Sequence, residues 1–346
     1  MLFWVIGLSV YAIISTALWL VTMRRAKRIS RKLVQYTDTE RKSYQSKADQ
    51  AMHLNQNFQK FVPRQFVEHI YKQNQSLELG YADEDNVAIM FCDIRGFTGL
   101  SEKMKPQELM KFLNSYFLRM NAPIHDNKGF IDKFIGDAIM ALFDNPEGSD
   151  SDKAQDSIRA AMGLRRALYL YNEHREKSGY GPVNIGIGIH FGPVIIGTVG
   201  SDDRMDTTVI GDSVNIAQRL ESLAPIYDVD IIVTEQLVAT TEYAFASRTI
   251  DWVKVKGRTE PLKLVEILAH LPDELQEQRL ARAPAIQQGL DLRIEGKLRE
   301  ALHVFRSAKK LSPQDPVLKH HIKWTEELIL HGIPDIWDGA LQIGSE

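Results

Sequence analysis

The sequence predicts an α/β fold in which helices pack on a mixed β-sheet, and three observations lead to this class. Apolar, strand-like segments such as 87–92 and 183–191 alternate along the chain with amphipathic helical segments. Pairs of short strands joined by tight turns add hairpins to that alternation. The 346 residues, 44% hydrophobic and 25% charged, have a typical globular balance and suffice for a large core. Alternating strands and helices with interspersed hairpins indicate a sheet covered by helices.

Composition excludes several functional classes. A net charge of -3 gives no electrostatic reason to expect a nucleic-acid partner. The single cysteine, Cys92, lies in an apolar strand, which rules out a disulfide framework and a thiolate metal cluster. It also favours a reducing, cytosolic setting for most of the chain. The histidines show no metal-binding spacing, and His320, His321 and His331 are expected on the surface.

The first element is an uncharged run at 2–23 that is long enough for a transmembrane helix, which needs roughly 20 apolar residues. Basic residues follow it directly: Arg24, Arg25, Lys27, Arg28, Arg31 and Lys32. By the positive-inside rule, this asymmetry predicts an uncleaved anchor in the lipid bilayer with everything after residue 23 in the cytoplasm. The alternative, a cleaved signal peptide, would need basic residues before the run and a shorter apolar core.

The segment 24–79 is predicted to be a polar juxtamembrane stalk. Residues 24–62 contain no Gly or Pro, and their sparse apolar positions alternate in steps of three and four. This spacing favours a weak parallel coiled coil between two copies of the chain, and a solvated linker helix remains the alternative. The basic residues at its start suit anionic lipid head groups. A short amphipathic helix is expected at 61–73.

The next segment contains two aspartates at strand ends. The expected elements are a polar loop at 80–86, a strand over 87–92, a helix over 105–121 and a hairpin with strands 130–134 and 137–143. Asp93 ends the first strand and Asp137 opens the last. Paired carboxylates of this kind suit two hard divalent cations set against the phosphates of a substrate. The alternative is that each aspartate is a turn or cap residue.

The second half of the chain continues the alternation. A helix over 154–177, a strand over 183–191, a strand and helix over 206–223, a strand over 229–233 and a hairpin over 249–268 are expected in that order. Gly186 and Gly188 share one face of their strand, so another element can pack closely against that face. Thr234 is expected to cap a short helix.

The tail after residue 270 is predicted to be helical. The segment 289–316 resembles one tetratricopeptide repeat, whose small and bulky packing positions are matched by Gly289, Gly296, Ala301, Phe305, Ala308 and Pro313. Three or more such repeats are usually needed for an array that is stable alone. The single unit is therefore expected to pack against the preceding domain or against a protein partner.

Four motifs, taken together, resemble the class III nucleotide cyclases, and most of all the bacterial adenylate cyclases with Thr in the base-selecting position. They are FCDIRGFTGLSE at 91–102, IDKFIGDAIMALF at 131–143, TVIGDSVNIAQRLE at 208–221 and VKGR at 255–258. The resemblance covers residues 58–268. It implies a ferredoxin-like βαββαβ core and a head-to-tail homodimer with two active sites at its interface.

The resemblance implies a metal role for the two aspartates. Asp93, Asp137 and the backbone carbonyl of Ile94 are expected to hold two Mg²⁺ or Mn²⁺ ions about 3.5–4 Å apart. One ion would lower the pKa of the ribose 3′-hydroxyl, and the other would hold the triphosphate. Backbone N–H groups of the following turn, including Phe97 and Thr98, are expected to bind phosphate oxygens.

Base selection is assigned, by the same resemblance, to Lys133 and Thr208. Adenine presents an acceptor at N1 and a donor at N6, which suits a lysine that only donates and a threonine that can accept. A guanylate cyclase would need an acceptor such as Glu at position 133. The alternative for Lys133 is a solvated strand lysine. Thr207 departs from the pattern, because relatives often have an aromatic residue there.

Three further residues take roles from the resemblance. Asn215 is expected to orient the ribose, and Arg219, four residues later on the same helix face, to stabilise charge on the α-phosphoryl group. The alternative for Arg219 is a surface ion pair, although no acid lies three or four residues away. Lys256 is expected to bind the terminal phosphates, and Lys254 on the same strand face competes for that role. In the family, these residues and the metal aspartates come from opposite subunits.

The expected protein is an adenylate cyclase, a phosphorus–oxygen lyase that converts ATP to 3′,5′-cyclic AMP and pyrophosphate. Its expected parts are a membrane anchor (1–23), a stalk (24–79), a catalytic domain (80–270) and a helical tail (271–346), in a single-pass homodimer of the inner membrane. Two alternatives are a guanylate cyclase and a non-catalytic nucleotide sensor that recruits partners through its tail. The sequence does not identify the activating stimulus.

Overall fold

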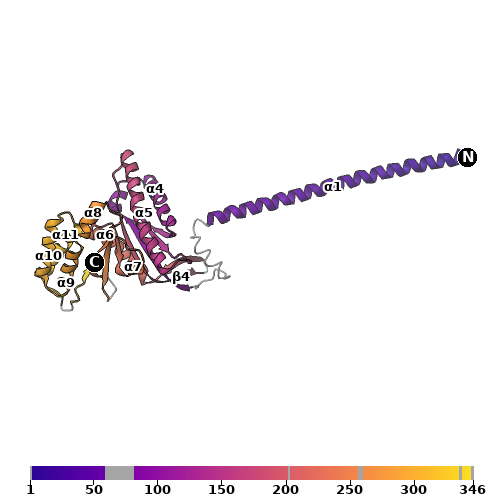
Figure 1. Cartoon of the computed structure of the whole chain (residues 1–346). Coiled ribbons are helices and arrows are strands. Elements are labelled where there is room, and N and C mark those ends of the chain that lie inside the picture. Colours follow the sequence, from indigo (N-terminus) through magenta and orange to yellow (C-terminus); the bar gives the residue numbers. More distant parts are fainter. Residues whose placement is uncertain (1, 59–81, 202, 256–259, 335–336, 344–346) are drawn as a thin grey trace. The chain divides into compact units, whose positions relative to one another are not determined.

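The computed structural model describes residues 2–58, 82–201, 203–255, 260–334 and 337–343, without the side chains of 2–13, 34, 38, 39, 43, 55–58, 204, 255, 342 and 343. The chain divides into two compact units, Met1–Arg64 and Gln65–Glu346. Figure 1 shows the described residues of the first unit as one helix, α1 (Leu2–Phe58), so the predicted stalk is helical up to Phe58.

The structure does not support the predicted membrane anchor. None of the helices in the described part of the chain is long and apolar enough to cross a membrane. Part of the run at 2–23 has no described side chains. The helix expected at 61–73 lies outside the described residues.

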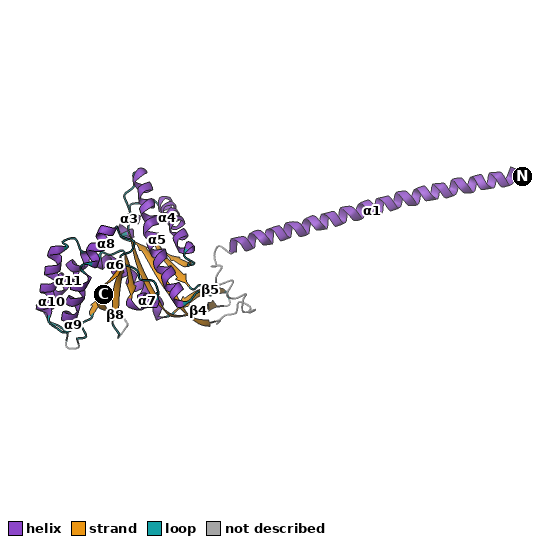
Figure 2. Cartoon of the chain, in the orientation of Figure 1, coloured by secondary structure: helices purple, strands orange, loops and turns teal. Residues whose placement is uncertain are grey.

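The second unit contains one mixed sheet with helices on both faces (Figure 2). Its strands are β1 (Ala82–Ile94), β2 (Phe130–Ile135), β3 (Ala138–Phe143), β4 (Ile185–Ser201), β5 (Arg204–Ile210), β6 (Ile231–Thr234), β7 (Ser247–Val255), β8 (Leu262–Ile267) and β9 (Leu341–Ile343). Its helices are α3 (Phe97–Ser101), α4 (Pro106–Asp126), α5 (Asp150–Lys177), α6 (Asp212–Tyr227), α7 (Glu235–Thr240), α8 (Asp273–Leu280), α9 (Ala283–Ile294), α10 (Leu298–Leu311) and α11 (Pro316–His331).

The strand order confirms the expected core topology. The sheet runs β2-β3-β1-β4-β6-β8-β7-β9, with β5 paired to β4. The first four strands are antiparallel neighbours, with α4 between β1 and β2 and α5 between β3 and β4. This order is the ferredoxin-like βαββαβ arrangement.

The central strand β1 is buried on both faces, which explains its continuous apolar run. Successive strand residues point to opposite sides of a sheet. Ala88, Met90 and Cys92 pack against α4 and α5, whereas Val87 and Ile89 belong to the opposite cluster. The α4 face that meets the sheet repeats every four residues, through Phe112, Tyr116, Met120 and Ile124.

The loop expected at 80–86 is wrong over most of its length, because β1 begins at Ala82. The extra residues pair with an extension of β4, from Ala82 opposite Gly197 to Asn86 opposite Pro193. Burial alternates along this ribbon between exposed and half-buried positions. Polar side chains are tolerated where a strand has a solvated face, so the segment has loop-like composition while forming a strand.

The close approach expected at Gly188 is confirmed. A Cβ atom on this residue would lie 2.1 Å from the backbone nitrogen of Glu221 and 2.5 Å from the carbonyl oxygen of Ala217. Helix α6 therefore rests directly on the backbone of β4. Because Asn215 and Arg219 belong to α6, this contact also sets their height above the sheet.

The tail packs on the catalytic sheet. Ile286, Phe305 and Leu318 from α9, α10 and α11 share one apolar cluster with Ile250 of β7 and Leu264 of β8. A Cβ on Gly289 would lie 2.2 Å from the ring of Phe305, as expected for a small residue facing a bulky one. The helical tail is thus present, and its likeness to a tetratricopeptide repeat stays a prediction.

The surface placement of two histidines is wrong. His321 is fully buried, donates from Nε2 to the carbonyl oxygen of Ile250 at 2.7 Å and stacks on Phe305. His320 lies against Tyr227 of α6, and burial lowers its pKa to about 4. Both residues lie where α11 meets the preceding domain, a contact that helix periodicity in the tail alone does not reveal.

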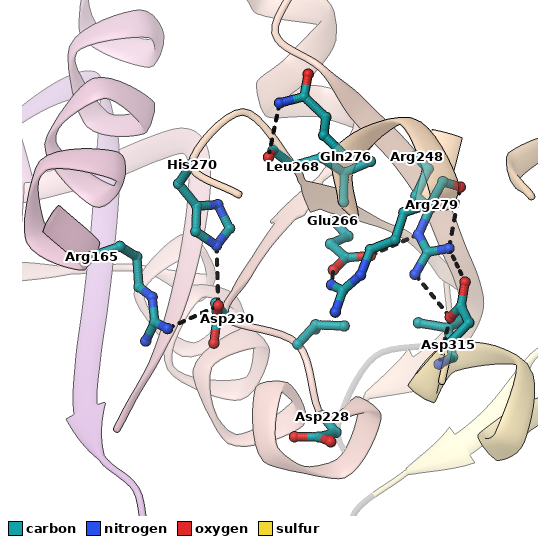
Figure 3. A network of polar contacts seen from close by, with 12 residues as sticks. Arg165, Asp228, Asp230, Arg248, Glu266, Leu268, His270, Gln276, Arg279 and Asp315 are labelled. Carbon is teal, nitrogen blue, oxygen red and sulfur yellow. Dashed lines mark hydrogen bonds and ion pairs between the residues drawn. The ribbon is translucent and has the colours of Figure 1, made fainter. Parts of the chain in front are cut away.

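A buried ionic network also joins the tail to the sheet (Figure 3). Arg248 on β7 pairs with Glu266 on β8 at 2.7 Å and with Asp315, the N-cap of α11. Arg279 of α8 contacts the same glutamate. Loss of one partner from a buried pair typically costs about 3–5 kcal/mol, since the other charge is left uncompensated. The network therefore fixes the position of the tail helices.

The packing of α6 on β4 gives a first prediction. Gly188→Ala should lower the free energy of unfolding by about 1–3 kcal/mol, because its methyl group would overlap backbone atoms of α6. Gly181→Ala is the matched control, since no atom lies within 4 Å of its Cβ position. Denaturant unfolding of both variants measures the difference. Equal stability of Gly188→Ala and the parent protein would contradict the described contact.

Candidate active site

The two predicted metal-binding aspartates lie together at one edge of the sheet. Cys92 of β1 pairs with Ile139 of β3, so Asp93 and Asp137 occupy the adjoining ends of these strands. Gly136, at φ +65°, makes the tight turn that precedes Asp137. The backbone N–H of Ile94 donates to Oδ2 of Asp137 at 3.3 Å. The expected trio of Asp93, Ile94 and Asp137 therefore shares one place.

The electrostatics of this edge favour a cation. Burial, together with a hydrogen bond to Asp93 and the negative charge of that residue, raises the pKa of Asp137 to about 7. Oδ1 of Asp93 is buried and has no hydrogen-bond partner among the described residues. Two crowded carboxylates with an unpartnered oxygen are what a hard divalent ion would relieve.

The protein supplies only part of a coordination shell. Within the described residues, no group of three or more His, Cys, Asp or Glu side chains could hold a metal ion. Two carboxylates and the carbonyl of Ile94 fit ions such as Mg²⁺ or Mn²⁺, because these bind through few protein ligands and complete their shell with substrate phosphates and water. The donor set therefore fits the expected cofactor.

Glu221 is a third acid at this edge, and the motifs gave it no role. Asp93 pairs with Gly186 of β4, and a Cβ on that glycine would lie 3.3 Å from Oε1 of Glu221. Burial and the charges of Asp93 and Asp137 raise the pKa of Glu221 to about 7. The signal available in the sequence was its place at the end of the third motif, two residues after Arg219.

The turn after Ile94 lies where the phosphate contacts were predicted. Gly96 has φ +68° and precedes the short helix α3, whose first two residues are Phe97 and Thr98. Phe97 packs against the core beside α4, and Thr98 is exposed. The first N–H groups of a helix have no acceptor within that helix, so these two are suited to bind an anion.

The predicted base-selecting residues are in direct contact. Lys133 on β2 donates from Nζ to Oγ1 of Thr208 on β5 at 2.8 Å, across 75 residues of sequence. A bulge between Ile131 and Lys133 also brings the buried carboxylate of Asp132 to 3.4 Å from the lysine nitrogen. Burial raises the pKa of Asp132 to about 6, partly offset by Lys133. Sequence reasoning missed Asp132, although it adjoins Lys133.

Asn215 and Arg219 are placed on α6 as predicted, one exposed and one half-buried. Neither side chain forms a hydrogen bond or ion pair with any residue that the structure describes. No such contact joins them to Asp93 or Asp137 within the chain. Arg219 is therefore not the surface ion pair of the alternative interpretation.

Two lysines were candidates for binding the terminal phosphates, Lys256 and its competitor Lys254. Lys256 lies outside the described residues. Lys254, its competitor, forms an ion pair with Asp338 at 2.5 Å. That lysine is thereby engaged by the C-terminal segment.

Asp230, which sequence reasoning also missed, lies between Arg165 and His270 (Figure 3). Asp230 pairs with Arg165 of α5 at 3.0 Å and with His270 at 3.1 Å. Arg95, which directly follows Ile94, lies 3.9 Å from the same carboxylate and 3.3 Å from Asp228. Burial alone would raise the pKa of Asp230, but His270 and Arg165 hold it below its usual range.

Comparison with known proteins gives one matching family. Residues 80–267 match the family model of the adenylate and guanylate cyclase catalytic domain. An adenylate cyclase of Anabaena cylindrica is 43% identical over 221 residues, which are 62% of this chain and 43% of that protein. The terminal-differentiation specific adenylate cyclase of Dictyostelium discoideum is 35% identical over 262 residues, 74% of this chain and 12% of that protein. The chain thus spans less than half the length of either relative.

Solved structures agree with this match. The adenylyl cyclase CyaB from P. aeruginosa has a TM-score of 0.50 and 29% identity, covering 54% of this chain and 95% of that one. A bacterial light-regulated adenylyl cyclase has a TM-score of 0.58 and 25% identity, covering 70% and 69%. The sheet order, the paired aspartates and these matches lead to one conclusion. The chain belongs to the family of the adenylate and guanylate cyclase catalytic domain.

Proposed function

We propose that the protein is an adenylate cyclase that converts ATP to 3′,5′-cyclic AMP and pyrophosphate. The contact between Lys133 and Thr208 carries the choice of substrate. Lysine offers only donors, which adenine N1 accepts, and the threonine oxygen keeps a lone pair for the N6 amino group. Relatives named adenylate cyclase support the same choice.

The metal end of the site would bind Mg²⁺ or Mn²⁺ through Asp93, Asp137 and the carbonyl of Ile94. Bound there, these ions supply activation of the ribose 3′-hydroxyl and neutralisation of phosphate charge. The chain fixes both carboxylates on strand ends, so their separation changes little on binding. Arg95 pairs with Asp228 and Asp230 and so holds in place the turn that follows Ile94.

The remaining groups act on the nucleotide directly. Arg219 would stabilise the charge that grows on the α-phosphoryl group, and its lack of a carboxylate partner among the described residues leaves its guanidinium available. Asn215, one helical turn earlier, would orient the ribose. The N–H groups of Phe97 and Thr98 would bind phosphate oxygens.

The proposal requires two copies of the chain. Asn215 and Arg219 form no hydrogen bond or ion pair with Asp93 or Asp137 among the described residues, and by the family resemblance each chain would contribute half of each site. The strands that carry Lys133 and Thr208, and β4, which pairs with β5, also expose large apolar side chains. These are Phe134 and Ile135 on β2, Ile195 on β4, and Met205 and Ile210 on β5. Exposed apolar patches of this kind mark protein interfaces.

Three parts of the proposal rest on the sequence alone. They are the phosphate contact of Lys256, the membrane anchor at 2–23 with its inner-membrane location, and a protein partner for the tail. Fractionation of cells that express the full chain tests the anchor: recovery in the membrane fraction after a high-salt wash is expected. Recovery in the supernatant would refute the anchor and leave the catalytic proposal untouched.

The metal assignment leads to the second prediction. The purified chain should form cyclic AMP from ATP with Mn²⁺, and Asp137→Ala should lower the rate at least about 100-fold. Loss of an outer partner of a metal ligand already costs about 10–100-fold, and loss of the ligand costs more. Asp126→Ala, an exposed aspartate at the end of α4, is the matched control. Full activity of Asp137→Ala would refute the metal site, and a chain without any cyclase activity would favour the nucleotide-sensor alternative.

The base contact leads to the third prediction. Lys133→Glu combined with Thr208→Cys should shift the ratio of kcat/KM for ATP over GTP by about 100-fold or more toward GTP, because unpaired buried polar groups reject the wrong base strongly. A carboxylate at position 133 would lie beside Asp132, so the pair is also measured with Asp132→Asn. Lys310→Glu, at an exposed position of α10, is the control for the change of charge. An unchanged preference for ATP would mean that Lys133 does not read the base.

A further inference from the structure

A pocket of about 490 Å³ opens between α4 and α5, away from every residue assigned to the nucleotide site. Its lining includes Lys111, Phe112, Arg119, Tyr171 and Arg175. Pockets for small organic ligands in proteins have volumes of about 300–1,000 Å³, so the size suits a small molecule larger than a bare ion.

Arg175 gives the pocket its chemistry. The residue is only 8% exposed, and its guanidinium carbon lies over three aromatic rings, 4.9 Å from Phe112, 5.8 Å from Tyr171 and 5.6 Å from Tyr180. Nε donates to the carbonyl oxygen of Gly181 at 2.8 Å. No carboxylate of the described residues pairs with the two terminal nitrogens. Buried charges in proteins are ordinarily paired, so an anion is the expected partner of this edge of the guanidinium.

Positive charges outnumber negative ones around the pocket. Lys111 and Arg119 are exposed at its rim on α4 and have no ion pair with a described residue. Glu108 is the one acid among the described lining residues, and its carboxylate accepts from the backbone N–H of Lys105 at 3.2 Å. That acid is therefore engaged in capping α4. The pocket as a whole attracts negative charge.

Besides the polar residues Ser115, His174 and Ser178, the rest of the lining is aromatic or apolar. Phe112, Tyr171 and Tyr180 present their rings around the guanidinium, and Met104 adds an apolar, adaptable side chain at the same wall. Aromatic rings bind planar groups by stacking or edge contacts worth about 0.5–1.5 kcal/mol beyond burial. We propose that this pocket binds a small organic anion, whose carboxylate or phosphate pairs with Arg175 and whose flat apolar body lies against these rings.

The pocket lies one layer of side chains from the metal end. The ring of Tyr116 lies 6.4 Å from that of Phe112 and 6.3 Å from that of Tyr171, measured between centroids. The hydroxyl of Tyr116 lies 3.6 Å from Sγ of Cys92, the residue before Asp93. An anion in the pocket would thus contact the aromatic cluster that supports the metal-binding strand, from a site separate from that of the nucleotide.

The test measures binding rather than activity, so it does not depend on the proposed function. The full chain is titrated with phenyl phosphate, benzoate and, as the neutral counterpart, phenol, and binding is followed by calorimetry. Saturable binding of at least one anion and none of phenol is expected. The anion that binds tells whether phosphate or carboxylate is preferred.

Variants assign the site and form the fourth prediction. Lys111→Gln with Arg119→Gln, both at exposed positions, should weaken the binding of the anion about tenfold, which is about 1.4 kcal/mol. Arg175→Met should abolish it. Arg166→Gln, an exposed arginine of α5 outside the pocket, and Asp137→Ala should leave it unchanged. Absence of binding by both anions, equal binding of phenol, or unchanged affinity in the Lys111/Arg119 double variant would overturn the proposal.

Discussion

Repulsion between Asp93 and Asp137 is the interaction on which the rest of the structure depends. Two carboxylates at adjoining strand ends would separate in a flexible loop, but the buried pairing of β1 and β3 holds them together. Burial and the closeness of Asp93 raise the pKa of Asp137, and Glu221 adds a third acidic group to the same edge. The apolar core stabilises an arrangement that is unfavourable by itself and that the proposed divalent cations would make favourable.

The positions of the other proposed catalytic groups depend on the elements that surround this edge of the sheet. The hairpin that delivers Asp137 also carries Lys133, whose partner Thr208 arrives from β5. Helix α6 lies directly on β4 because Gly188 has no side chain, and it presents Arg219 without an intrachain acid partner among the described residues. Among the described residues of one chain, the proposed metal ligands form no hydrogen bond or ion pair with the proposed base-reading residues. This arrangement is the physical basis for the proposed shared sites of a dimer.

Sequence reasoning predicted what depends on local pattern. Alternation and turn residues located the strands and helices, and the motifs located the aspartates and named Lys133 and Thr208, which the structure brings into contact. Sequence reasoning failed where the structure of a segment depends on partners that are far away in the sequence. The start of β1 depends on its pairing with β4, and the burial of His321 depends on where α11 packs. Asp230 and Arg175 are likewise ordinary charged residues until three-dimensional neighbours give them a role.

The central claim, that each active site combines the metal end of one chain with Arg219 of another, is tested by mixing two inactive variants. Asp93→Ala and Arg219→Ala chains, each inactive alone, should regain cyclase activity when heterodimers form. Random mixing leaves one intact site in half of the dimers, so about a quarter of the parent activity is expected. Heterodimers that are demonstrably present but form no cyclic AMP would contradict the claim.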